Sequence, residues 1–181
     1  VSKLYDKRTI GSDEVGTGDY FGPIVVTASY VTKEDIPYLE ELGVKDSKKM
    51  SDEKILEIVP KIIQKISYTS VVLSNKEYNE KYQDDMNMNK MKAFLHNRVL
   101  YQQLQKEKKD GMEVDAVIVD QFANPYVYYH YLKGLEHVVR NITFFTKAED
   151  KFLSVACSSL ISRYIFLKEF HKLETELDMK L

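Results

Sequence analysis

Runs of β-branched and apolar residues alternate with longer amphipathic segments along the chain, and this order limits the folds available to it. Strands are expected at 8–14, 23–31, 67–74, 114–120 and 141–147. Helices are expected at 51–66, 75–82, 88–108, 125–135 and 154–177. The order β-β-α-β-α-α-β-α-β-α is typical of the α/β class, and it predicts a mixed five-stranded sheet flanked by helices.

Local signals add detail to this layout. The first two strands are expected to pair antiparallel, because only a short glycine-rich stretch separates them. The helix that follows begins with Ser51 as its N-cap, and Pro60 is expected to kink or split it, since proline lacks the amide hydrogen that a helix interior needs. In the closing helix, the small residues Ala156, Ser158 and Ser159 allow close packing.

The composition is that of an ordinary globular domain. The chain has 181 residues, of which 44% are hydrophobic and 30% are charged, and this excludes a disordered or fibrous protein. Its apolar runs are far shorter than the roughly 20 residues of a membrane span and no signal peptide is visible, so we expect a cytoplasmic protein without a membrane partner. The lone Cys157 agrees with a reducing compartment.

The charge balance does not by itself indicate a nucleic-acid-binding protein. The formal net charge is −2, whereas such proteins usually carry a basic surface. Binding of this kind must therefore come from local clusters of lysine, which occur at 45–49, 90–92 and 106–109. Solvated helix faces produce similar clusters, so both interpretations stay open on these grounds.

Acidic residues stand where three of the predicted strands end. Asp13 and Glu14 end the first strand. Asp120 ends the fourth, and Glu149 and Asp150 follow the fifth. Active sites of open α/β sheets form beyond the carboxyl ends of the strands, so these acids could converge on one crevice. Carboxylates are ligands that Mg²⁺ prefers, and a pair of divalent cations held by them can promote phosphodiester cleavage.

Strand geometry places a condition on the first two acids. Neighbouring residues of a regular strand point to opposite faces, so Asp13 and Glu14 can serve one metal cluster only if the chain bends there or a backbone carbonyl helps. The glycines of the following GTG make a bend easy and leave backbone amides open to a sugar-phosphate chain. Two other interpretations stay open: adjacent acids also occur in solvated turns, and Glu149 also suits a helix N-terminus.

Several segments resemble the type 2 ribonucleases H. They are, in order, GSDEVGTGDYFGPIVV, LGVKDSKKMSD, VIVDQF and KAEDKFLSVACSSLISRY, and they run from about Thr9 to Tyr164. Three particular forms are similar to bacterial ribonuclease HIII, namely DEVGTGDYFGP, NMNKMKAFLHN and DQFANP. The related ribonuclease HII starts with a DEAGRGP-like motif, so Thr17, at the position of that arginine, favours the HIII form.

The resemblance implies a ribonuclease H-like fold and an endonuclease that hydrolyses the RNA strand of RNA/DNA hybrids. Catalysis would use a pair of Mg²⁺ or Mn²⁺ ions in the substrate complex and leave 5′-phosphate and 3′-hydroxyl ends. The residues implied as catalytic and metal-binding are Asp13, Glu14, Asp120 and Glu149. Those implied to bind substrate are Gly16, Thr17 and Gly18, which sense the ribose 2′-hydroxyl, and Lys45, Ser47 and Lys48, which contact phosphates. Asp150 is implied to be a bystander, and His96 is assigned no role.

Residues 1–181 are expected to form a single ribonuclease H-like catalytic domain. By the resemblance, an N-terminal domain similar to the TATA-binding protein and a C-terminal extension are missing from this sequence, so we expect a catalytic-domain fragment. A monomer without an obligate protein partner is expected. Two alternatives stay open: a fragment that binds hybrids without cutting them, and ribonuclease HII-like cutting at single embedded ribonucleotides.

Overall fold

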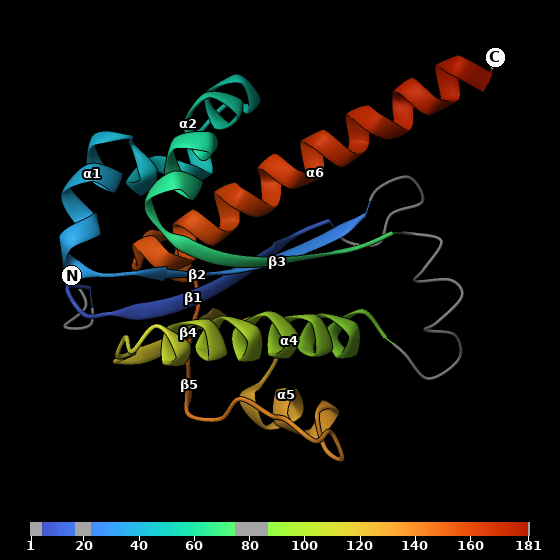
Figure 1. Cartoon of the computed structure of the whole chain (residues 1–181). Coiled ribbons are helices and arrows are strands. Elements are labelled where there is room, and N and C mark those ends of the chain that lie inside the picture. Colours follow the sequence, from blue (N-terminus) through green and yellow to red (C-terminus); the bar gives the residue numbers. More distant parts are fainter. Residues whose placement is uncertain (1–4, 17–22, 75–86, 181) are drawn as a thin grey trace.

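A mixed sheet of five strands forms the centre of the computed structural model, which describes residues 5–16, 23–74 and 87–180 (Figure 1). The strands are β1 (Thr9–Val15), β2 (Ile24–Val31), β3 (Ser67–Leu73), β4 (Ala116–Asp120) and β5 (Ile142–Phe145). They lie in the order β3-β2-β1-β4-β5. β1 pairs antiparallel with β2 and parallel with β4, and β5 continues the parallel half. The predicted fold class and the antiparallel first pair are confirmed.

Helices cover both faces of this sheet. They are α1 (Ile36–Glu41), α2 (Asp52–Lys65), α4 (Met88–Lys109), α5 (Pro125–Tyr131) and α6 (Leu153–Lys180). Short 3-10 turns occur at η1 (Lys33–Asp35), η2 (Val44–Lys49) and η3 (Ala148–Asp150). In Figure 1, α2 and α6 lie on one side of the sheet and α4 on the other, with α5 beside α4. Within the described ranges, no helix is long and apolar enough to span a bilayer.

Some helix predictions need correction. α2 is continuous, so Pro60 does not split it, because buried residues on both sides of the proline anchor the helix in the core. α5 ends at Tyr131, earlier than predicted, and the left-handed Gly134 (φ 93°) follows it. α1 is absent from the prediction because six residues give too short a periodic pattern. The predicted helix at 75–82 lies outside the described residues.

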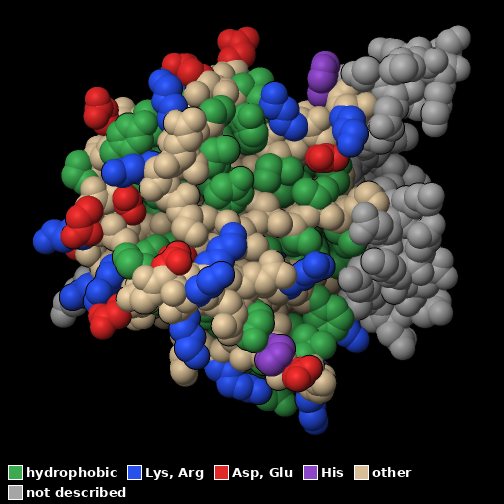
Figure 2. All heavy atoms as spheres, viewed as in Figure 1, with side chains coloured by type: hydrophobic (Ala, Val, Ile, Leu, Met, Phe, Trp, Pro, Cys, Tyr) green, Lys and Arg blue, Asp and Glu red, His purple; other side chains and the backbone are tan. Residues whose placement is uncertain are grey.

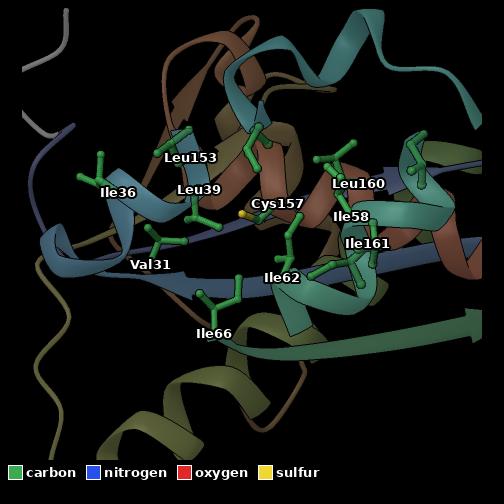
Figure 3. Packing of buried hydrophobic residues seen from close by; sticks show 14 residues of the cluster. Val31, Ile36, Leu39, Ile58, Ile62, Ile66, Leu153, Cys157, Leu160 and Ile161 are labelled. Carbon is green, nitrogen blue, oxygen red and sulfur yellow. The ribbon is translucent and has the colours of Figure 1, made fainter. Parts of the chain in front are cut away.

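The two largest hydrophobic clusters of the described residues lie on opposite faces of the sheet. On one face, α1, α2 and α6 contribute Leu39, Ile58 and Leu160, and Figure 3 shows these side chains packed around the buried Cys157. On the other face, Leu95 and its neighbours on α4 pack against the strands. Every residue of β2 is therefore buried, which explains why this strand is apolar or small along its length instead of alternating.

α6 lies in direct contact with the backbone of β1. A Cβ atom added to Gly11 would lie 2.5 Å from the backbone nitrogen of Val155, so no residue larger than glycine fits without movement. The Ser158 hydroxyl donates a hydrogen bond of 2.7 Å to the Gly11 carbonyl. The close packing predicted for the small residues of this helix is thus confirmed at Ser158, and it fixes the strand that carries Asp13.

Candidate metal and nucleic-acid site

Parallel strands bring two of the predicted acids together. In the β1–β4 register Ser12 lies opposite Val119, so the next residues, Asp13 and Asp120, are neighbours at the same end of the sheet. The backbone N–H of Ala148 donates to Asp120 Oδ1 at 3.3 Å, which ties η3 to the end of β4. Three strand ends therefore bring their acidic residues to one end of the sheet, where the sequence predicts them.

Burial separates this cluster from a solvated turn. Asp13 is 6% exposed and the Glu14 side chain is 11% exposed. Burial raises the pKa of Asp13 well above its usual range, and the charges of Glu14 and Asp120 act in the same direction. Burial is also the main cause of the raised pKa of the half-buried Asp120. A turn in water would leave these carboxylates exposed, so that alternative is wrong.

β1 does not bend at the two acids. Asp13 and Glu14 keep regular antiparallel pairing with Thr27 and Val26 of β2. The left-handed residue comes later, at Gly16 (φ 90°), where an added Cβ would lie 2.3 Å from the Pro23 carbonyl oxygen. The two acids nevertheless interact, because the Glu14 backbone N–H donates to Asp13 Oδ1 at 2.8 Å. Gly16 therefore takes a left-handed backbone only after the acids, and the rest of the GTG motif, Thr17 and Gly18, lies outside the described residues.

Glu14 meets two nitrogen-bearing side chains of α4. Lys92 Nζ lies 3.4 Å from Glu14 Oε1, and His96 Nε2 lies 3.6 Å from Oε2. His96 is fully buried, bonded through Nδ1 to the Ser12 hydroxyl at 2.7 Å and stacked on Phe122. Burial alone would raise the pKa of Glu14, but His96, Asp13 and Lys92 outweigh it and lower that pKa.

Neither α4 residue was assigned a role from the sequence. Lys92 and His96 are four residues apart, so the sequence does indicate that they share one helix face. It does not indicate that this face is turned toward β1 and Glu14.

Glu149 is held by the lysine-rich segment around η2. The Ser47 hydroxyl donates a short hydrogen bond to Glu149 Oε1, and Lys48 Nζ lies 3.1 Å from Asp150 Oδ2. Arg163 of α6 fastens the same segment through Nη1, which donates to the Ser47 carbonyl at 2.8 Å. Nη2 of the same guanidinium donates to the carbonyl of Met50, the C-cap of η2, at 2.9 Å. Two of the predicted phosphate contacts thus lie beside the fourth acid, and Arg163 is a contributor that the sequence prediction missed.

The third predicted phosphate contact lies on the wall of a cavity. Lys45 pairs with Glu40 at 3.1 Å and lies over the Tyr5 ring. The cavity has a volume of about 620 Å³ and is lined by Tyr5, Lys45, Phe145, Glu149, Asp150, Lys151, Phe152 and Leu153. Figure 2 shows Lys and Arg side chains interspersed with Asp and Glu on one face of the molecule. On this face, attraction for a polyanion would therefore have to come from individual basic groups.

The donor set fits a divalent cation that prefers oxygen. Asp13, Glu14 and Asp120 bring buried or half-buried carboxylates together, and an added cation would offset their mutual repulsion. The fourth acid, Glu149, is turned toward Ser47. In the described residues, no three His, Cys, Asp or Glu side chains are gathered tightly enough to enclose one ion. Oε1 of Glu149 accepts the Ser47 hydrogen bond, so metal binding at all four acids would use Oε2 of Glu149 or a rotated side chain.

Known proteins resemble this chain closely. Residues 10–181 match the family model described as Ribonuclease HII. Ribonuclease HIII of Bacillus subtilis is 48% identical over 95% of this chain and 54% of its own length. Ribonuclease HIII of Phytoplasma mali is 47% identical over 95% of this chain and 58% of its own. The chain thus spans about half the length of these relatives.

Solved structures agree in fold. Bst-RNase HIII in complex with Mn²⁺ superimposes with a TM-score of 0.92 at 41% identity, over 97% of this chain and 57% of that one. The ribonuclease H2 of Pyrococcus horikoshii, at 23% identity, shares the fold with a TM-score of 0.74. The resemblance drawn from the sequence motifs is confirmed, and the chain belongs to the ribonuclease HII family, with ribonucleases HIII among its close relatives.

Proposed function

We propose that the protein is an endonuclease that hydrolyses the RNA strand of RNA/DNA hybrids, as the name of its ribonuclease HIII relatives suggests. The observation that carries this proposal is the meeting of Asp13, Glu14 and Asp120 at the ends of adjacent parallel strands, with Glu149 close by on η3. Residues 1–181 would form its catalytic domain, acting as a monomer in the cytoplasm.

The four acids would hold Mg²⁺ or Mn²⁺. When bound, a pair of such ions would supply an activated water and stabilisation of the leaving oxygen in phosphodiester hydrolysis. Attack of that water on phosphorus with breakage of the bond to the 3′-oxygen, which takes up a proton, would leave 5′-phosphate and 3′-hydroxyl ends. Asp13 is the most buried of the acids, and its position is fixed through its own carbonyl, which accepts a hydrogen bond of 3.3 Å from Ser162 on α6. An anchored backbone lets Asp13 present its carboxylate to the ion without rearrangement of β1.

The η2 segment would bind the nucleic acid. Lys48 is half-exposed and Lys45 is more exposed, so both can turn toward a phosphate at small cost in existing ion pairs. Ser47 can bind a phosphate only by releasing Glu149, because its hydroxyl has a single hydrogen to donate. Gly16, Thr17 and Gly18 would contact the ribose and its 2′-hydroxyl, the group that distinguishes RNA from DNA.

A cleavage assay with a matched pair of variants tests the proposal. The intact protein is incubated with a labelled RNA/DNA hybrid and Mg²⁺ or Mn²⁺. Asp120→Asn is expected to reduce cutting about a thousandfold, equal to roughly 4 kcal/mol in barrier. Asp150→Asn, at a neighbouring acid that pairs with Lys48, is expected to change the rate by less than about tenfold. Equal cutting by wild type and Asp120→Asn would refute the assignment.

A second candidate is ribonuclease HII-like cutting at single embedded ribonucleotides, because the matching family model is that of ribonuclease HII. The same assay on a duplex with one ribonucleotide separates the two activities. Preference for the all-RNA strand supports the HIII-type activity, and preference for the single ribonucleotide supports the alternative. Salt-dependent binding without products under any metal indicates a hybrid-binding module.

A further inference from the structure

Lys92 occupies an unusual position for a lysine. Its Nζ lies 3.4 Å from Glu14 Oε1 and 5.7 Å from the centre of the Phe122 ring, and its side chain is 17% exposed. Lysine side chains are mostly exposed unless they are paired, so the enclosed position depends on the partner carboxylate. That carboxylate is one of the acids of the candidate metal site.

His96 lies beside the other oxygen of the same carboxylate. Nδ1 is hydrogen-bonded to the Ser12 hydroxyl at 2.7 Å. Nε2 faces Glu14 Oε2 at 3.6 Å, and it has no hydrogen-bond partner among the residues that the structure describes. Lys92 and His96 lie one helical turn apart on α4, so a single helix presents both groups to the two oxygens of Glu14. The carboxylate thus has one cationic and one imidazole neighbour.

We propose that Lys92 is a resident counter-ion of the metal site: it neutralises Glu14 while no metal ion is bound, and it competes with the ion for that carboxylate. This inference rests on the proposed function only in taking Glu14 as a metal ligand.

The energetic reasoning follows from linkage. An ammonium group at 3.4 Å stabilises the metal-free form of the site, in which Asp13, Glu14 and Asp120 would otherwise repel one another. When a divalent ion binds Glu14, the ion must displace this ammonium group or tolerate its charge. The Lys92 charge then reduces the apparent affinity for the ion. Coupling between two interacting sites typically changes an affinity by about 5-fold to 150-fold.

Metal binding provides a readout that is independent of cleavage. The affinity of the intact protein for Mn²⁺ alone is measured by calorimetry or by the electron paramagnetic resonance of free Mn²⁺. Lys92→Met is expected to bind Mn²⁺ at least about 5-fold more tightly than wild type. Lys92→Arg keeps the charge and is expected to stay near the wild-type value. Lys90→Met, two residues earlier on α4 and over the Phe94 ring, is the matched control and is expected to leave the affinity unchanged.

The melting temperature of the metal-free protein gives a second readout, in which the same substitution lowers stability although it raises the affinity for Mn²⁺. Lys92→Met is expected to melt below wild type without metal and to gain more on addition of Mn²⁺. If Lys92→Met does not fold, Lys92→Gln replaces it, with the same expectation.

The inference is overturned if the neutral variants bind Mn²⁺ no more tightly than wild type. It is also overturned if Lys92→Arg binds Mn²⁺ as tightly as Lys92→Met does. Either result leaves the metal site in place. If neither wild type nor the neutral variants bind Mn²⁺, the inference and the metal site of the proposed function fail together.

Discussion

Replacement of Gly11 by alanine tests the contact that fixes β1 against α6. The new Cβ would lie 2.5 Å from Val155 N, 2.6 Å from Ser154 Oγ and 2.7 Å from Val155 Cγ2. Ordinary contacts begin near 3.4 Å, so the strand or the helix must move by about 1 Å. Overpacking of a core costs about 1–3 kcal/mol, and the backbone nitrogen cannot rotate away, so we expect the upper end of that range. For a chain of this size, about 3 kcal/mol corresponds to a loss of roughly 6–12 °C in melting temperature.

Thermal and urea denaturation of Gly11→Ala measure this loss, with Gly111→Ala as the control. In the part of the chain that the structure describes, no atom lies within 4 Å of an added Cβ at Gly111, and its φ of 70° is left-handed, so its penalty is conformational alone, about 1 kcal/mol. Gly11→Ala should therefore be the more destabilised variant by about 2 kcal/mol. If the two variants lose equal stability, α6 does not press on β1 as described.

Three further predictions concern the site and the core. Burial and the Glu14 charge raise the pKa of Asp13, so the folded metal-free protein binds a proton there more tightly than the unfolded chain does, and its stability falls as pH rises above the usual aspartate pKa. Asp13→Asn should remove that loss and stabilise the metal-free protein at pH 7 by about 1 kcal/mol, while abolishing cleavage; a less stable variant in denaturant titrations contradicts this. Arg163→Met removes two hydrogen bonds to backbone carbonyls at η2, each worth about 1.5–3 kcal/mol, so it should weaken hybrid binding and speed proteolysis of the η2 segment. The control is Arg98→Met, at an exposed arginine, and equal proteolysis of the two variants would contradict the prediction. Burial raises the pKa of the Cys157 thiol, so a thiol reagent should label it only after unfolding, and rapid labelling of the native protein would show that the α2–α6 core opens.

The sheet could be predicted because its strands carry local signals. β2 consists of consecutive apolar, β-branched and small residues, and β4 ends its apolar run at an acid. Both segments could therefore be predicted as strands, with their positions in the sequence. The segment at 32–50 was not predictable, because α1, η1 and η2 are short; η2 packs against α6, and α1 packs against η1 and η2. The continuity of α2 through Pro60 has the same origin, since tertiary packing outweighs the loss of one helical hydrogen bond.

The candidate site divides in the same way. Asp13, Glu14 and Asp120 were predictable because strand ends of an α/β sheet meet at one edge. The roles of Lys92, His96 and Arg163 depend on which strand or turn faces their helix, and no local pattern encodes that. The position of Glu149 at the end of β5 was predictable, but its hydrogen bond with Ser47, a residue far away in the sequence, was not.

The central claim is that the four acids form one metal site for an RNA/DNA hybrid. Anomalous scattering from a crystal of the intact protein with Mn²⁺ and a hybrid tests it most directly. We expect Mn²⁺ peaks within about 2.0–2.4 Å of carboxylate oxygens of Asp13, Glu14, Asp120 and Glu149. Peaks that avoid these carboxylates with the hybrid bound would contradict the claim.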